Sequence, residues 1–425
     1  MKIVHIHSGG EGGAGRACMA IHNALLQQGV DSKVLTYRAM GGNPSVYVAR
    51  PSNLNKYIPP KNKIIRKIKN KLRNRGYGLL LTEVYDRAIW ELEKKHPDVC
   101  FTSSYSSYDL AENPLVKEAD IVHLHWVQNF LDFESFFKKM AEVNKPVVWT
   151  LHDLNPMMGG FHHARIKAQY YEEFKMVEDA MYLIKRKALV DYPNLSLVAL
   201  SSQMKELISQ HEFFTGKPIY TVFNCVDGKK FSMIDKNVTR SALGLETDKT
   251  IILFVSSMLN DVEKGFAECV KALDNEGFNN VMLVCVGDGV IPETKYYPIR
   301  HFNSVRGEIW LSLLYSAADY FVNSSFQESF GNTTVEAMLC GTPVVMTPVG
   351  IAKDIIVEEN GVVCENCTAE ALAKAIKTVM SRQYDSGKIR EMAIDKVSPE
   401  KIGKDYIAVY EDVLKRSCAT NKSTS

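Results

Sequence analysis

The sequence predicts an α/β protein with two Rossmann-like domains, each built on a doubly wound parallel sheet. Three observations predict this fold class. The chain has 425 residues, more than one typical domain contains. It opens with a strand, a glycine-rich loop, a helix and a second strand. From Thr250 onward, buried strands again alternate with helices, as they do in the first half.

The first elements follow from their apolar spacing. Lys2 to His7 is a buried strand, and Ser8 to Gly15 is the glycine-rich loop. Apolar residues at helical spacing predict a helix from Arg16 to Gln28, and Lys33 to Tyr37 is the second strand. This order is the opening of a doubly wound sheet.

Three glycines of the loop, Gly10, Gly12 and Gly15, fit the dinucleotide pattern G-x-G-x-x-G. Glycine is so dense here that some such spacing arises easily. The dinucleotide pattern also needs an acidic residue after the second strand, where Tyr37 and Arg38 stand. A nicotinamide-linked enzyme is therefore a weak alternative.

The composition excludes several classes of protein. Apolar residues make up 46% of the chain and charged residues 24%, which are ordinary globular values. The formal net charge of +2 implies no general attraction to nucleic acid. No signal-peptide pattern follows Met1, the nine cysteines are scattered, and no apolar run is long enough to span a bilayer. We therefore expect a cytoplasmic protein in a reducing compartment.

A basic segment interrupts the first domain at residues 61–75. Eight of its fifteen residues are Lys or Arg, and Ile64, Ile65, Ile68 and Leu72 fall on one helical face. Two interpretations stay open: a helix that lies on an anionic membrane surface, and a solvated helix whose apolar stripe joins the core. A nucleic-acid patch is a third, but no aromatic residues interleave the charges.

Two predicted strands, residues 120–126 and 145–153, end in histidine. The carboxyl ends of parallel strands point into the ligand crevice, so this shared ending favours a site over satisfied core histidines. The spacing matches no zinc motif, and we expect no metal. The candidates in these strands and the loop that follows are His125, His152, His162 and His163.

Two carboxylates lie eight residues apart in the stretch from 327 to 345. Between Glu328 and Glu336 stands a loop that leads into a helix start, with Gly331 free to take a φ that other residues resist. Residues 332–334 are good cap residues, and the backbone N–H groups of such a helix start bind phosphate. A nucleotide-diphosphate sugar has hydroxyls at each end and phosphate in the middle, which fits this layout. Gly341 ends the helix before a buried strand.

This stretch resembles the donor-site signature of the retaining family 4 glycosyltransferases, two-domain enzymes of the GT-B fold. Their pattern is a Glu, seven residues, a second Glu and an Ala-Met-x-x-Gly-x-Pro-Val-Val tail, and it is complete here. The resemblance implies that Glu328 contacts the donor sugar and Glu336 the ribose hydroxyls. It implies that the loop between them binds the diphosphate, through Ser329, Phe330, Gly331, Asn332 and Thr333. A surface Glu before an ordinary amphipathic helix is the alternative, and the tail alone would fit it.

Two stretches of the first half are also similar to this family. Residues 12–17 match an opening Gly-Gly-Ala-x-Arg-Ala, which implies that Gly13 and Arg16 lie near the donor phosphate on a loop facing the interdomain cleft. Thr150-Leu-His152 matches a strand whose histidine contacts the reacting sugar. His152 is therefore the first catalytic candidate, and His125, His162 and His163 are acceptor-side candidates.

The second half carries further similarity and one departure. Lys264-Gly265 matches a Lys-Gly whose lysine meets the donor phosphates, so Lys264 joins His152 and Glu328 as a catalytic candidate. Where the family often has Gly-Arg, Ser257-Met258 stands here, so the cationic partner of Lys264 is either missing or supplied elsewhere, by Arg16 or Arg306.

The resemblance also implies the organisation and the activity. The stretch from Asn224 to Phe231 resembles the hinge strand of the family, which divides the chain into domains 1–217 and 218–397, with helix 398–417 returning to the first. The expected activity is retaining transfer of a sugar to a glycan or lipid-linked acceptor in cell-surface polysaccharide synthesis, at the inner face of the plasma membrane, with no cofactor and no obligatory metal.

Three alternatives stay open. A nucleotide-sugar epimerase of the same fold would need no acceptor, and a phosphorylase would need a lysine-bound pyridoxal group that no feature demands. A non-catalytic module that only binds nucleotide sugar belongs to a different class. Retained donor binding without turnover would favour that module.

Overall fold

The computed structural model describes the chain except residues 11, 39–42, 53, 56–62, 74–78, 246–247, 276–277, 279, 304, 306 and 424–425. It divides into two compact units. Unit 1 contains Met1–Val198, Glu206–Tyr220 and Tyr406–Ser425. Unit 2 contains Ala199–Lys205 and Thr221–Asp405.

Unit 1 is built on a seven-stranded sheet in the order β3-β2-β1-β4-β5-β6-β7. The pairs from β3 to β6 are parallel, and the strand order reverses between β1 and β4. This reversal is the topological switch point, where ligands bind in sheets of this kind. The strands are β1 Lys2–Ile6, β2 Asp31–Thr36, β3 Val46–Val48, β4 Ile121–Leu124, β5 Val147–Thr150, β6 Leu195–Ala199 and β7 Ile219–Thr221.

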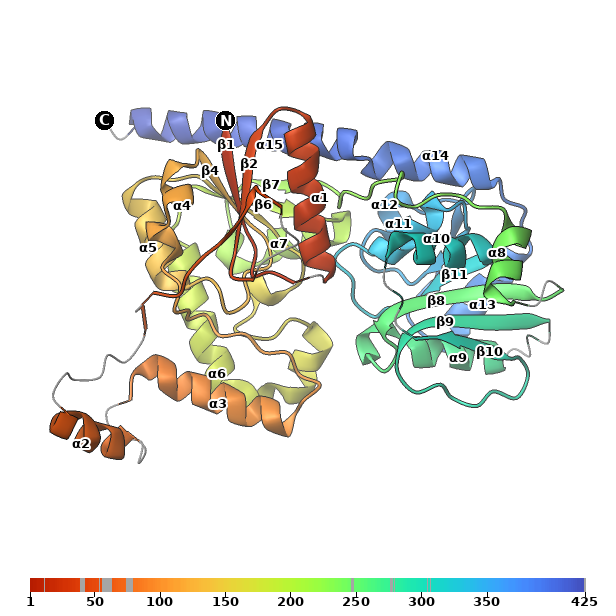
Figure 1. The fold of residues 1–425 in the computed structure, drawn as a ribbon, viewed down its shortest axis with the longest axis horizontal. Coiled ribbons are helices and arrows are strands. Elements are labelled where there is room, and N and C mark those ends of the chain that lie inside the picture. The colour runs from red at the N-terminus through yellow and green to blue at the C-terminus, as the bar shows by residue number, and fades with distance from the viewer. Residues whose placement is uncertain are drawn as a thin grey trace. The chain divides into compact units, whose positions relative to one another are not determined.

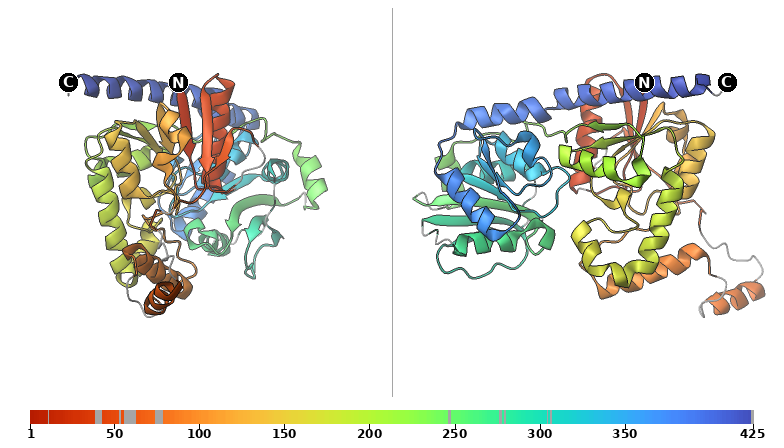
Figure 2. Two further views of the ribbon diagram at one scale, coloured as in Figure 1. Left: turned by 60° about the vertical axis from the view of Figure 1, so that its left-hand side comes forward. Right: turned by 180° about the vertical axis from the view of Figure 1, so that it is seen from behind.

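Helices cover the sheet of unit 1, with α1 packed beside β2 (Figure 1) and α3 beside α6 (Figure 2). The last helix also contributes to this unit, because the Tyr410 hydroxyl lies 2.7 Å from Nδ1 of His123 on β4. The helices up to residue 210 are α1 Gly13–Gln27, α2 Lys63–Arg73, α3 Leu81–Lys95, α4 Pro114–Glu118, α5 Phe133–Glu142, α6 Ala164–Leu189 and α7 Ser202–Gln210, with 3-10 turns Leu110–Glu112, Asn155–Met157 and Glu212–Phe214.

Unit 2 is built on a six-stranded parallel sheet in the order β10-β9-β8-β11-β12-β13. Its switch point lies between β8 and β11. The strands are β8 Thr250–Met258, β9 Val281–Asp288, β10 Ile299–Phe302, β11 Tyr320–Asn323, β12 Val344–Met346 and β13 Gly361–Val363.

Both faces of this sheet are buried, which explains the continuous apolar runs of its strands. Ile251 and Leu253 of β8 point into a core formed with α8, α10, α11 and α14, whereas Ile252 and Phe254 point into a core formed with α9 and α13. The helices are α8 Lys236–Leu243, α9 Phe266–Asn275, α10 Glu308–Ala317, α11 Asn332–Leu339, α12 Ala352–Ile355, α13 Ala369–Met380, α14 Ser386–Val397 and α15 Pro399–Ser423, with a 3-10 turn at Val262–Lys264.

The predicted α/β class with two parallel sheets is confirmed. The sequence gives no prediction for α8 and α14, whose contribution to the core is small: α14 buries only Ile389, Ala393 and Val397. Helix α6 begins at Ala164, directly after the loop that carries His162 and His163. No described helix is long and apolar enough to cross a membrane.

Candidate functional site

The candidate donor residues of unit 2 surround its switch point. The loop after β8 carries Lys264, and the loop after the neighbouring strand β11 carries Glu328. The two loops bond to each other, since Phe326 N–H donates to Glu263 O at 2.8 Å. Two residues distant in sequence therefore meet at the edge where a parallel sheet binds its ligand.

Lys264 and Glu328 form an ion pair, with Lys264 Nζ 2.8 Å from Glu328 Oε1. The Ser325 hydroxyl donates to the same carboxylate oxygen at 2.9 Å. The charge of Glu328 raises the pKa of Lys264, so the amine is cationic at neutral pH. The pair is partly exposed, which leaves it within reach of a ligand.

Helix α11 begins directly after Gly331, which lies at φ 114°, in the left-handed region. The expectation that residues 332–334 cap this helix with their side chains is wrong, because the N-cap is Gly331 and makes no side-chain cap bond. Thr334 instead accepts a hydrogen bond from the Asn323 side chain at the end of β11, at 3.1 Å. The helix start therefore presents backbone rather than a side-chain oxygen, which suits an anion.

Close packing between backbone segments fixes the loops that carry Lys264 and Glu328. A Cβ at Gly265 would lie 2.1 Å from Ser324 O, and one at Gly350 would lie 2.4 Å from Phe330 O. The ring of Phe330 is buried in the core, so this residue is available to a ligand only through its backbone. Only glycine lets these segments approach so closely.

Glu336 lies on α11 and is buried. The hydroxyl of the buried Tyr315, on α10, donates to Glu336 Oε2 at 2.9 Å. At the start of the same helix, the Asn224 amide donates to Asn332 Oδ1 at 3.1 Å. The second carboxylate of the signature is thus held in one orientation.

Two candidate histidines of unit 1 lie at the carboxyl ends of β4 and β5, beside the switch point of its sheet. His125 directly follows β4 and His152 lies two residues beyond β5. His125 is buried, and both its ring nitrogens are bonded to other histidines, His5 at 2.9 Å and His152 at 3.0 Å. Burial lowers the pKa of His152 to about 3, so its ring is neutral at pH 7.

His162 is held in an ion pair rather than presented to solvent. Its Nδ1 lies 2.6 Å from Asp153 Oδ2, and its Nε2 lies 2.7 Å from the Thr102 hydroxyl. Although burial opposes the charge, Asp153 raises the pKa of His162 to about 9, and the same pair lowers the pKa of Asp153 to about 2. His163 is the N-cap residue of α6.

The remaining predicted residues are Gly13, Arg16 and Arg306. Gly13 and Arg16 are exposed at the start of α1, and Arg16 N–H donates to Gly12 O. Arg306, a candidate for the missing cation, lies outside the described residues. Three further residues of these clusters were not predicted from the sequence: Ser325, Tyr315 and His5. His5 carried a signal, because β1 shares the histidine-bearing pattern of the strands around 125 and 152.

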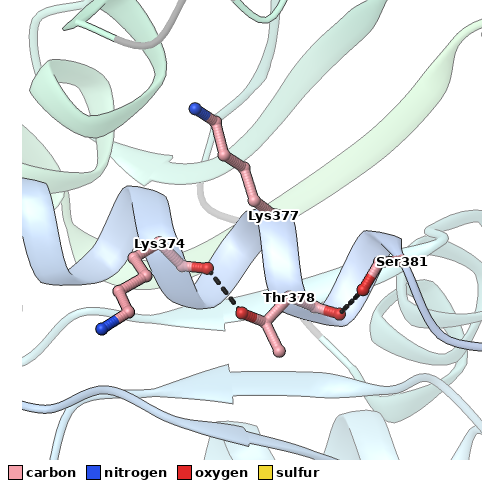
Figure 3. Close-up of a pocket in the computed structure, with 4 residues that line it drawn as sticks. All are labelled: Lys374, Lys377, Thr378 and Ser381. Carbon is pink, nitrogen blue, oxygen red and sulfur yellow. Dashed lines mark hydrogen bonds between the residues drawn. The ribbon is translucent and has the colours of Figure 1, made fainter.

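A surface depression of about 420 Å³ lies on α13, remote in sequence from the signature (Figure 3). The hydroxyls of Thr378 and Ser381 donate to carbonyls of their own helix, at 2.8 Å each. The amines of Lys374 and Lys377 point away from each other. No convergent chemistry marks this depression as a site.

Comparisons with known proteins find similarity to glycosyltransferases. Residues 249–382 match the family described as glycosyl transferases group 1. An uncharacterised glycosyltransferase of Methanocaldococcus jannaschii is 25% identical, over 70% of this chain and 76% of its own. The N-acetyl-alpha-D-glucosaminyl L-malate synthase of Bacillus anthracis is 23% identical, over 77% of this chain and 87% of its own.

The fold is also that of a solved glycosyltransferase from Rickettsia africae, with a TM-score of 0.60 and 17% identity over 97% of this chain and 98% of that chain. The structure of Anabaena HepE in complex with UDP has a TM-score of 0.62 and 17% identity, with 97% of this chain and all of that chain covered. HepE has also been solved with UDP-glucose. The matched segment contains Lys264, Glu328 and Glu336. The protein is a glycosyltransferase that takes its sugar from a nucleotide-sugar donor, and its residues 249–382 are similar to the group 1 family.

Proposed function

We propose that the enzyme is a retaining hexosyltransferase that moves a sugar from a nucleotide-diphosphate sugar to a hydroxyl of a glycan or lipid-linked acceptor. The observation that carries the proposal is the switch point of unit 2, where the Lys264–Glu328 pair and the glycine-capped start of α11 lie on adjoining loops. A cation and free helix-start amides are the groups that bind a diphosphate.

Each residue then has a role in departure of the diphosphate. Negative charge grows on the diphosphate as the bond to the anomeric carbon breaks, and Lys264 and the backbone of residues 329–333 stabilise it. Glu328 positions Lys264 and faces the sugar, which becomes oxocarbenium-like. Glu336, oriented by Tyr315, binds the ribose hydroxyls. We assign no covalent nucleophile and no metal to this step.

Unit 1 supplies the remaining groups. We propose that His152 contacts the reacting sugar and that Gly13 and Arg16 act on the donor phosphate. Since both ring nitrogens of His125 are bonded to histidines, His125 acts through His152 rather than on the acceptor directly. His162 and His163 stay acceptor-side candidates, with the charge of His162 fixed by Asp153.

We propose that α2 holds the enzyme against an anionic membrane, where a lipid-linked acceptor would lie. The interpretation that its apolar stripe joins the core is wrong for the described residues 63–73, none of which is buried. Ile64, Ile65, Ile68 and Leu72 are 45–70% exposed. The helix adds six positive charges, which complement anionic lipid: Lys63, Arg66, Lys67, Lys69, Lys71 and Arg73.

A turnover assay tests the proposed reaction. UDP-sugars are the first donors to examine, because HepE has been solved with UDP and UDP-glucose. Nucleotide release that requires an acceptor hydroxyl, with the anomeric configuration retained in the product by NMR, is the expected result. Isomerisation of the donor without acceptor would instead identify an epimerase, and donor binding without turnover would identify a binding module.

A further inference from the structure

Three histidines of unit 1 form one hydrogen-bonded chain across neighbouring strands. Nδ1 of His5, on β1, lies 2.9 Å from Nε2 of His125, just past β4. Nδ1 of His125 lies 3.0 Å from Nε2 of His152, just past β5. The parallel pairing of β1 with β4 and of β4 with β5 sets this spacing.

Each ring in this chain is neutral, because burial lowers the pKa of all three histidines. A neutral imidazole has one N–H and one lone pair. Since each bond joins Nδ1 of one ring to Nε2 of the next, all three histidines must carry their proton on the same nitrogen. Either each ring donates from Nδ1, toward His152, or each donates from Nε2, toward His5.

The two ends of this row of histidines differ in burial, and this difference selects which ring nitrogen carries the proton. His5 Nε2 is buried and has no hydrogen-bond partner among the described residues. His152 is only half-buried, and no described residue bonds its Nδ1. A chain that pointed toward His5 would bury an unpaired N–H there, one of the rarest features of folded proteins. If each ring instead donates from Nδ1, toward His152, the buried Nε2 of His5 carries only a lone pair.

Cys18 lies beside these rings, with its sulfur within 4.8 Å of a ring nitrogen of both His5 and His125. Burial raises the pKa of Cys18, so it is a neutral thiol. It forms no hydrogen bond with Nε2 of His5. Together these three residues resemble a metal-ligand set. However, both ring nitrogens of His125 are used in the chain, so a metal bound there would break it.

We infer that His5 and His125 are positioning residues that hold His152 in the tautomer with its proton on Nδ1. The inference rests on the proposed contact between His152 and the donor sugar. In this tautomer, His152 offers a fixed N–H donor to a sugar hydroxyl oxygen, and its Nε2 lone pair is occupied by His125.

The tautomers are measured directly by long-range ¹H–¹⁵N NMR of the full-length protein with ¹⁵N-labelled histidine, near neutral pH. His→Gln variants assign the signals. The expected result is a proton on Nδ1 of His5, His125 and His152. A proton on Nε2 of His152 would overturn the inference, and so would stoichiometric zinc in the purified protein that is lost in Cys18→Ser.

Breaking the chain in its middle tests the link to activity. In His125→Leu, the ring of His152 should lose its single Nδ1–H signal, and kcat should fall about tenfold. His22→Gln is the control, because among the described residues the ring nitrogens of buried His22 bond to Ser32 and Ser45 and to none of these three histidines. An unchanged His152 signal in His125→Leu would refute the inference. If the wild-type tautomer is as expected but His152→Gln transfers sugar normally, the proposed role of His152 fails instead.

Discussion

Lys264 Nζ lies 2.8 Å from Glu328 Oε1, although 64 residues separate the two in sequence. They meet because β8 and β11 are neighbours at the switch point of their sheet. The pair ties a cation to the loop that leads into α11. Preorganised charge of this kind stabilises a leaving diphosphate without further rearrangement.

Replacing Lys264 should therefore damage catalysis far more than stability. We expect Lys264→Met to lower kcat/KM by about 10²–10³-fold, the usual effect of losing one preorganised transition-state group. The free energy of unfolding should change by only about 1 kcal/mol or less, since the pair is partly exposed. Steady-state kinetics and urea unfolding measure both.

Lys271→Met is the matched control for this variant. Lys271 pairs with Glu268 at 2.9 Å on the exposed face of α9. Its loss should leave kcat/KM unchanged. Equal losses of activity in the two variants would show that Lys264 has no special role.

Tyr315→Phe should weaken donor binding without blocking it. The variant removes the bond that orients Glu336, and one hydrogen bond contributes about 1 kcal/mol, so the donor Kd should rise roughly fivefold. Calorimetric titration with nucleotide sugar measures this. In the control Tyr297→Phe, which loses a bond to Val270 O at 3.1 Å elsewhere in unit 2, stability should fall but Kd should not change.

The ion pair of His162 and Asp153 predicts a specific dependence of stability on pH. The folded pKa of His162, about 9, lies above its ordinary 6.5, so its contribution is complete below pH 6.5 and is lost as pH rises through 9. The folded pKa of Asp153, about 2, lies below its ordinary 3.8, so its contribution is lost as pH falls through 2. The stability lost in His162→Gln should therefore be largest between pH 4 and 6.5.

Urea unfolding across this pH range tests the pair. His22→Gln is a control of opposite sign, because burial lowers the pKa of His22 to about 4, and its contribution is lost as pH falls from 6.5 through 4. A His162→Gln deficit that stays constant from pH 5 to pH 9 would contradict the ion pair.

Helix α2 should bind vesicles that contain anionic lipid and not neutral vesicles. Each basic residue at such a surface contributes about 1 kcal/mol, and binding should fall as salt rises. Ile68→Asn should weaken sedimentation with anionic vesicles, whereas Ile309→Asn, at an exposed isoleucine of α10, should not. Equal binding to neutral and anionic vesicles would rule out this surface.

The sequence predicted the local parts of the site and missed the long-range ones. The loop, the helix and the strand around Glu328 and Glu336 follow from spacing and glycine, which are local properties. The hydrogen bond from Tyr315 that orients Glu336 joins two different helices, so it cannot be predicted from the spacing of residues along the sequence. The cap at Gly331 was mispredicted because Thr334 bonds to Asn323, a tertiary partner that competes with local capping.

In unit 1, strand-end histidines were visible in the sequence, but their connection was not. His125 and His152 were predicted at one edge of the sheet. That His5 joins them depends on β1 lying beside β4, which follows from strand order rather than from sequence spacing. The pairing of His162 with Asp153 similarly depends on how the loop between β5 and α6 folds.

A melting-temperature screen tests whether the start of α11 and Glu336 bind a nucleotide-sugar donor. Wild type and Glu336→Ala are heated with a panel of nucleotide-diphosphate sugars and free nucleotides, since a ligand that binds only the folded state raises Tm. We expect a rise in Tm with one nucleotide family, lost in Glu336→Ala. No rise with any nucleotide sugar, or an equal rise in both proteins, would contradict it.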